Sequence, residues 1–202
     1  MAWKVNILIA SVGGQGGLTL SRVLAAAAVY AGLSVRTGET LGMSQRFGSV
    51  VSYVRIGERV YAPTFPPGEA DCMVALELTE AVRNLHMLRR SGLLVAADTV
   101  KPPVSASLDQ TPHPSRGELL AALREADARL VVVPARELAL RTGNPRAANM
   151  VLLGVLNKLA GLLPHSAVEK AIINVLRGRR GETSVKAYWL GVDYAARLRE
   201  SS

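Results

Sequence analysis

Cysteine and histidine are scarce in this 202-residue sequence, which contains one cysteine, Cys72, and three histidines. A lone cysteine cannot form an internal disulfide, hold an iron–sulfur cluster or complete a cysteine-based zinc site. The histidines, His86, His113 and His165, are scattered and lack the spacing of metal ligands. We therefore expect no metal centre on this chain. Cys72 falls within an apolar run, so we also expect a buried, inert thiol.

Long apolar runs and aromatic residues are also scarce. No stretch approaches the roughly 18 to 20 consecutive apolar residues that a membrane helix needs. The N-terminal apolar segment is too short for a signal peptide and is interrupted by Asn6. These features predict a cytoplasmic protein with no membrane contact. Aromatic residues make up 4% of the chain, too few for the stacking platforms of single-strand nucleic-acid binders.

Basic residues outnumber acidic ones by 24 to 16, which gives a net charge of +8. The arginines are dispersed, and the dense basic patch is the segment RGRR at 177–180. Such a balance permits nucleic-acid binding, but it is equally compatible with an anionic small molecule or an acidic partner subunit. Because the charge is dispersed and aromatic residues are few, we expect no nucleic-acid partner.

Hydrophobic periodicity predicts an α/β domain. Strands are expected at 4–10, 33–37, 70–77, 93–98 and 128–135, and helices at 18–31, 78–92 and 116–126. The first strand, helix and second strand form a βαβ unit, which predicts parallel pairing with a right-handed crossover. Residues 38–49 are expected to form a long loop, and residues 50–63 a β-hairpin that turns at Gly57-Glu58.

The pattern becomes entirely helical from about residue 146. Helices are expected at 147–163, 165–178 and 182–198, and the first of these is apolar most of the way round, so it should be buried. The sequence thus predicts one domain, residues 1–202. Its α/β core, about 1–145, has a mostly parallel, Rossmann-like sheet that is flanked by helices, and it includes a β-hairpin. A C-terminal helical extension covers about 146–202.

The segment SVGGQGGLTLSR (11–22) places four glycines within five residues directly after the first predicted strand. Glycines at this point permit a tight turn and let backbone N–H groups approach a phosphate, which the following helix N-terminus also favours. The spacing is not G-x-G-x-x-G, because Thr19 stands at the third position, and no P-loop Gly-Lys-Ser/Thr follows. The glycines therefore serve either an unidentified anion or close packing of helix on strand.

Other polar segments carry weaker signals. The predicted loop at 38–49 contains Gln45 and Arg46, which either contact a ligand or subunit or belong to a solvated connection. Glu77 and Glu80, at the end of a predicted strand, face either solvent or a ligand. No nucleophile elbow, metal-ligand spacing or Ser–His pairing is present, so we expect no catalytic residue. These residues indicate a binding or scaffolding domain.

Several motifs, in this order, resemble the gamma subunit family of the 2-oxoacid:ferredoxin oxidoreductases. They are the glycine loop, GMSQRFGSVVSYVRIG (42–57), GEADCMVALE (68–77), NMVLLGVLNKLAGLLP (149–164) and VKAYWLGVDYA (185–195). Within that family the sequence is most similar to the small (beta) subunits of the indolepyruvate:ferredoxin oxidoreductases. It departs from the family pattern at Gly17, where a β-branched residue is common, and at Phe47, where glycine is common.

The resemblance implies a non-redox subunit that is not catalytic alone, in a complex of the EC 1.2.7 class active in amino-acid catabolism. Such a complex converts an aryl 2-oxoacid and coenzyme A (CoA) to acyl-CoA and CO2 while reducing ferredoxin. Thiamine diphosphate, magnesium and iron–sulfur clusters are then expected on a large alpha subunit and none on this chain. The two subunits are expected to form a hetero-oligomer, and ferredoxin is expected to bind to the complex.

The implied site on this chain binds the CoA phosphates or serves the subunit interface. Its residues are Gly13, Gly14, Gln15, Gly16, Gly17, Gln45 and Arg46. Two alternatives stay open: a gamma subunit of a pyruvate- or 2-oxoglutarate-type enzyme, and a stand-alone nucleotide- or flavin-binding module.

Overall fold

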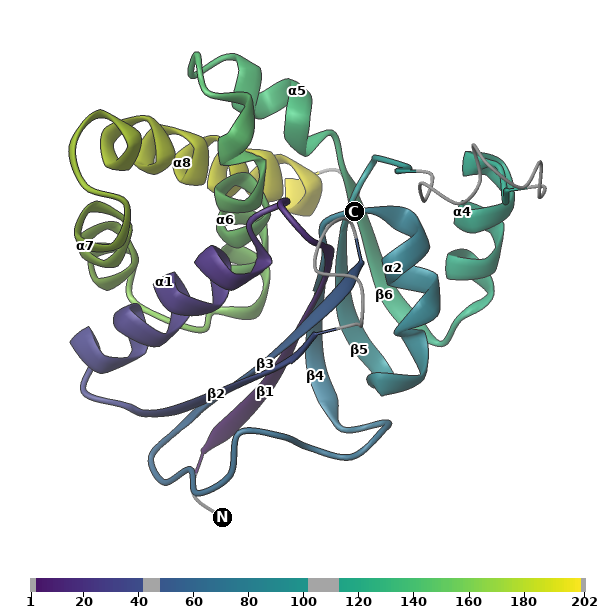
Figure 1. Cartoon of the computed structure of the whole chain (residues 1–202), viewed down its shortest axis with the longest axis horizontal. Helices are drawn as coiled ribbons and strands as arrows, with labels where there is room; N and C mark the ends of the chain where they lie inside the picture. Colours follow the sequence, from purple (N-terminus) through teal and green to yellow (C-terminus); the bar gives the residue numbers. More distant parts are fainter. Residues whose placement is uncertain (1–2, 42–47, 102–112, 201–202) are drawn as a thin grey trace.

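A six-stranded sheet lies at the centre of the computed structural model, which describes residues 3–41, 48–101 and 113–200 (Figure 1). The strands are β1 (Lys4–Val12), β2 (Ser34–Leu41), β3 (Ser49–Gly57), β4 (Ala70–Ala75), β5 (Leu88–Ala97) and β6 (Ala128–Val133), in the order β2-β3-β1-β4-β5-β6. The pairs β1–β4, β4–β5 and β5–β6 are parallel, whereas β3 is antiparallel to both of its neighbours. The predicted fold class, α/β with a mostly parallel sheet, is confirmed.

Helices cover both faces of this sheet (Figure 1). One face carries α1 (Gly17–Tyr30), α6 (Ala148–Ala160), α7 (His165–Leu176) and α8 (Gly178–Glu200), and the other carries α2 (Leu78–Arg83) and α4 (Arg116–Glu125). The short helices η1 (Leu85–Met87), α5 (Ala135–Leu140) and η2 (Pro145–Ala147) connect the larger elements. The three helices after residue 147 form the C-terminal helical extension expected from the sequence.

The larger hydrophobic core lies under α1, α6, α7 and α8. Alternate residues of β1, including Ile7 and Ile9, face this core, and Leu8 faces the smaller core under α2 and α4. Helix α6 is buried almost all round, as its apolar pattern predicts. A Cβ atom at Gly154 of α6 would collide with the Tyr188 carbonyl oxygen of α8, so the two helices cross in direct backbone contact.

Strand β3 is inserted between β1 and β2, so the predicted direct pairing of the first two strands is wrong. These strands run parallel, but each forms its ladder with β3, from Lys4 opposite Gly57 to Val12 opposite Ser49 in the case of β1. The β-branched residues of β3 can pack on both faces of the sheet, which suits an interior strand.

The predicted hairpin at 50–63 is also wrong, because the chain forms no strand between Gly57 and Ala70. It folds back over the sheet instead. The Arg55 guanidinium donates hydrogen bonds to the carbonyl oxygens of Ala62 (3.2 Å) and Thr64 (3.0 Å). Pro63 packs against Gly38 of β2 and has no N–H group for a strand ladder.

Two further boundaries differ from prediction. The helix expected at 78–92 ends at Arg83, where the Asn84 side chain donates a hydrogen bond to the Glu80 carbonyl oxygen (2.9 Å), and residues 88–92 join β5. A side chain that bonds the backbone in this way competes with continued helix. Strand β2 extends to Leu41, into the predicted loop at 38–49.

Candidate functional site

A cleft lies at the point in the sheet where the strand order changes direction. From β1 the chain passes through α1 toward β2, whereas from β4 it proceeds to β5 and β6 on the other side. In open α/β sheets, ligands bind at this crevice beyond the carboxyl ends of the strands. A cleft of about 900 Å³ occupies it here, lined on the sheet side by Gly14, Leu76 and Thr99, which follow β1, β4 and β5.

The glycine loop forms the floor of the cleft beside α1. Gly14 and Gly16 both have φ of 90°, a backbone conformation that favours glycine. A Cβ atom at Gly14 would face open space, with no atom within 4 Å, whereas a Cβ at Gly16 would lie 2.6 Å from the Asn149 amide nitrogen. A Cβ at Gly17 would collide with the Ser11 hydroxyl. The loop therefore combines close packing at Gly16 and Gly17 with an open surface at Gly14.

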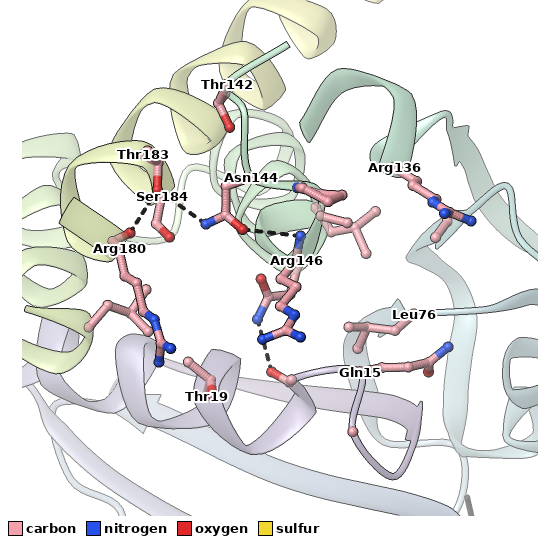
Figure 2. Close-up of a pocket in the computed structure, with 18 of the residues that line it drawn as sticks. Gln15, Thr19, Leu76, Arg136, Thr142, Asn144, Arg146, Arg180, Thr183 and Ser184 are labelled. Atoms are coloured by element: carbon pink, nitrogen blue, oxygen red, sulfur yellow. Dashed lines mark hydrogen bonds between the residues drawn. The ribbon is translucent and has the colours of Figure 1, made fainter. Parts of the chain in front are cut away.

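Internal hydrogen bonds hold the loop in shape. The Gln15 side-chain oxygen accepts a hydrogen bond from the backbone N–H of Val12 (2.8 Å). The backbone N–H of Gln15 donates to the Val12 carbonyl oxygen (3.1 Å). Gly13 donates its N–H to the Gly48 carbonyl (2.9 Å), which ties the loop to the start of β3. Of the predicted site residues, Gly14, Gln15 and Gly16 line the cleft, and Gln15 is visible at its edge (Figure 2). Gln45 and Arg46 lie outside the described residues.

The electrostatics of the cleft favour an anion. The N-termini of α1 and α6 both lie at its surface, and neither has a side-chain cap or an acidic residue in its first turn. The lining includes four arginines and no carboxylate among the described residues: Arg136, Arg146, Arg179 and Arg180. Within the described part of the chain, none of these guanidinium groups has an ion-pair partner. The arrangement suits a ligand with several negative charges.

Two asparagines fix the walls of the cleft relative to each other. Asn149 of α6, which is buried, donates a hydrogen bond to the Gly16 carbonyl oxygen (3.1 Å). Asn144 uses both ends of its amide: the nitrogen donates to the Thr183 hydroxyl of α8 (3.1 Å), and the oxygen accepts from the Arg146 N–H (3.2 Å). These bonds, drawn in Figure 2, hold the glycine loop, the 142–146 turn and the start of α8 together.

Several residues of the cleft carry no signal in the sequence that places them there. Arg136, Arg146 and Asn144 come from a stretch without a recognisable motif, and only the fold brings them to the glycine loop. Arg179 and Arg180 belong to the basic patch at 177–180, which composition reveals without giving it a position in the fold.

Glu77 and Glu80 face neither solvent nor the cleft, since each is about 1% exposed. Glu77 caps α2 by accepting from the Thr79 and Glu80 amides. The Glu80 carboxylate accepts from the Ser49 hydroxyl (2.5 Å) and forms an ion pair with Arg83. Their role is to hold α2 and the start of β3 in place.

The side chains that could hold a metal do not gather anywhere in the described residues, where no group of three or more His, Cys, Asp or Glu has suitable geometry. Cys72 is buried in β4, and burial raises the pKa of its thiol to about 12, as expected for an inert thiol. None of the described helices is long and apolar enough to cross a membrane.

Comparison with known proteins shows similarity over nearly the whole chain. The family described as pyruvate ferredoxin/flavodoxin oxidoreductase matches residues 6–194. The chain is 38% identical over 198 residues to the indolepyruvate oxidoreductase subunit IorB of Pyrococcus horikoshii, covering 96% of this chain and 98% of that protein. It is 30% identical over 177 residues to the common gamma subunit of the pyruvate/ketoisovalerate oxidoreductases of Pyrococcus abyssi, covering 87% of this chain and 88% of that protein.

Solved structures show the same fold. The gamma subunit of keto/oxoacid ferredoxin oxidoreductase from Geobacter sulfurreducens superposes with a TM-score of 0.72 at 22% identity, covering 96% of this chain and 99% of that one. The 2-oxoglutarate:ferredoxin oxidoreductase of Magnetococcus marinus, solved with 2-oxoglutarate, CoA and succinyl-CoA bound, superposes with a TM-score of 0.74 at 20% identity. That match covers 96% of this chain and 31% of the larger one.

Proposed function

The chain belongs to the pyruvate ferredoxin/flavodoxin oxidoreductase family, and from this premise we propose that it is the small, non-redox subunit of an indolepyruvate-type 2-oxoacid:ferredoxin oxidoreductase. Relatives named indolepyruvate oxidoreductase subunit IorB align over 97–98% of their length in Pyrococcus horikoshii and Methanothermobacter thermautotrophicus. The gamma subunit of the Pyrococcus abyssi pyruvate/ketoisovalerate enzymes aligns over 88% at lower identity. The higher coverage and identity of the indolepyruvate subunits favour an aryl 2-oxoacid as substrate of the complex.

The part of the reaction that this chain serves is the binding of CoA. The proposed site consists of Gly13, Gly14, Gln15, Gly16 and Gly17, with Gln45 and Arg46, and the cleft beside the loop. The observation that carries the proposal is the uncapped N-terminus of α1 in a cleft lined by four arginines and, among the described residues, no carboxylate. CoA bound to the structurally similar Magnetococcus enzyme supports this choice of anion.

The residues of this chain do not fit the cofactors that the family implies. Its one cysteine is buried with a raised pKa, and its described carboxylates and histidines form no metal site. We therefore assign thiamine diphosphate, magnesium and the iron–sulfur clusters to the large subunit. The chain, as one gamma-type domain over residues 1–202, holds the CoA phosphates and contributes to assembly, while decarboxylation and electron transfer to ferredoxin occur elsewhere.

The test is steady-state kinetics of the reconstituted complex with an Arg146→Ala variant. We expect the KM for CoA to rise about tenfold or more with kcat little changed, because a hydrogen bond to a charged group contributes about 1.5–3 kcal/mol. Arg124→Ala is the matched control, since Arg124 is an exposed arginine on α4, across the sheet from the cleft. Unchanged KM for CoA in both the Arg146→Ala and a Gly14→Val variant would rule out this site.

A further inference from the structure

We infer that the cleft contains a second phosphate subsite, formed by Arg179, Arg180 and Ser184 at the start of α8. This step rests on the CoA site proposed above. The second subsite selects a ligand that carries a phosphomonoester in addition to a pyrophosphate. In CoA that group is the 3′-phosphate of the ribose, so α8 distinguishes CoA from the analogue without it.

The first observation is the placement of two arginines against the dipole of their own helix. Arg179 and Arg180 lie in the first turn of α8, a 23-residue helix with no acidic residue in that turn. The N-terminus of a helix carries partial positive charge, so cationic side chains there are unfavourable unless an anion is present. A phosphate at this point interacts favourably with both guanidinium groups and with the free N–H groups of the helix.

The second observation is the strained turn that leads into α8. Helix α7 ends at Leu176 and α8 begins at Gly178, and the two residues of the turn, Arg177 and Gly178, have positive φ, of 50° and 52°. A non-glycine residue such as Arg177 rarely adopts this conformation, and such backbone strain is concentrated at ligand-binding sites. The sharp reversal places the first turn of α8 at the edge of the cleft.

The third observation is an unpaired hydroxyl at the cleft, on a residue that is otherwise buried. Ser184 lies one helical turn after Arg180, on the same face of α8, and lines the cleft although its residue is only 3% exposed (Figure 2). Its hydroxyl forms no hydrogen bond with any described residue, whereas the neighbouring Thr183 hydroxyl bonds the carbonyl oxygens of Arg179 (3.1 Å) and Arg180 (3.2 Å). The Ser184 hydroxyl is therefore available to donate to a phosphate oxygen in the cleft.

The position of these residues separates them from the glycine-loop subsite. In Figure 2, Arg180 extends from α8 toward Thr19 in the first turn of α1, while Arg146 lies over the middle of the cleft. The hydrogen bond between Asn144 and Thr183 fixes the start of α8 relative to Arg146. Two phosphate groups of one ligand can therefore be bound side by side.

The experiment compares CoA with dephospho-CoA in the reconstituted complex, using the wild type and an Arg179→Ala/Arg180→Ala double variant. In the wild type we expect a KM for dephospho-CoA about tenfold or more above that for CoA, from one charge-assisted contact or more. The double variant should raise the KM for CoA to near the value for dephospho-CoA and change the latter about twofold or less. Ser184→Ala should give a smaller loss of the same discrimination.

Two comparisons make the outcome decisive. An Arg179→Lys/Arg180→Lys variant keeps the charges, so it should retain most of the discrimination if the fold is intact. Arg146→Ala should raise the KM for both substrates. Equal KM values for the two substrates in the wild type, or an equal rise for both in the Arg179→Ala/Arg180→Ala variant, would overturn the second subsite and leave the CoA site standing. Unchanged KM for CoA in both Arg146→Ala and Gly14→Val would instead overturn the CoA site itself.

Discussion

At the scale of single residues, the glycines of the loop have distinct physical roles. Gly14 faces open space at the cleft, Gly16 is in contact with Asn149, and Gly17 is in contact with Ser11. Close packing thus accounts for Gly16 and Gly17, whereas Gly14 is the glycine that is open to the anion we propose. A substitution at Gly17 or Gly16 disturbs helix packing as well as any ligand, so side chains such as Arg146 are the cleaner probes.

Cys72 offers a prediction at this scale. Its thiol has a pKa of about 12 and is buried, so it stays protonated and inaccessible at neutral pH. We expect a thiol reagent such as 5,5′-dithiobis(2-nitrobenzoate) at pH 8 to label the native chain slowly, and to label it rapidly after unfolding in guanidinium. Stoichiometric labelling of the native chain within seconds would contradict the burial of this side chain.

The ion pair between Asp98 and Arg116 predicts how the stability of the fold depends on pH. The pKa of the Asp98 carboxyl is lowered, and the largest cause is the pair of 2.7 Å hydrogen bonds that Arg116 donates to it. A folded-state pKa below the unfolded value means that the pair stabilises the fold above about pH 4, and that this contribution is lost as pH falls further. The stability difference between wild type and Arg116→Ala, from urea unfolding, should therefore shrink below about pH 4. The stability difference between wild type and Arg124→Ala should not shrink over the same pH range.

At the scale of elements, local patterns predicted local structure well. The short apolar run, the glycines and the alanine-rich stretch within residues 4–31 indicated β1, the loop and α1, and the apolar periodicity after residue 146 indicated α6, α7 and α8. The insertion of β3 between β1 and β2 could not be predicted in this way, because strand pairing depends on partners distant in sequence. The helix predicted at 78–92 failed for a similar reason, since Leu88 pairs with Ala70.

The same limit applies to the candidate site. Gly14, Gln15 and Gly16 could be identified because their signal is contained within five residues. Arg136, Arg146 and Arg180 come from α5, η2 and α8, and no spacing in the sequence connects them. Their shared role depends on three helix ends meeting at one edge of the sheet.

The crossing of α6 and α8 gives a prediction at the element scale. Gly154→Ala places a methyl group against the Tyr188 backbone, and overpacking of this kind costs about 1–3 kcal/mol. The free energy of unfolding in urea should fall accordingly. Gly117→Ala is the control: this glycine is exposed in α4 and a methyl group there meets no close neighbour, so alanine should stabilise the chain by about 0.5–1 kcal/mol. Equal effects of the two substitutions would contradict the close crossing.

At the scale of the whole molecule, the chain has the features of a subunit. Its relatives are named as subunits of larger oxidoreductases and align with it over most of their length. We expect the chain alone to show no 2-oxoacid oxidation. Co-expression with its large subunit should yield a brown hetero-oligomer on size-exclusion chromatography, with CoA-dependent ferredoxin reduction.

The colour of the isolated chain provides the control for that experiment. Purified alone, it should be colourless and free of flavin absorbance. A yellow or nucleotide-loaded chain that does not associate with the large subunit would favour the stand-alone module instead.

The position of α6 also has a consequence for synthesis on the ribosome. This helix covers the sheet face that contains Ile7 and Ile9, yet it lies more than 130 residues further along the chain. While the nascent chain still lacks α6, that face of β1, β4 and β5 is uncovered except where α1 packs, and exposed apolar strands invite aggregation. The same late helices supply Asn149, Arg179 and Arg180 to the cleft. These helices therefore complete both the core and the proposed anion site, so a chain able to bind the proposed anion is also one whose sheet is already covered.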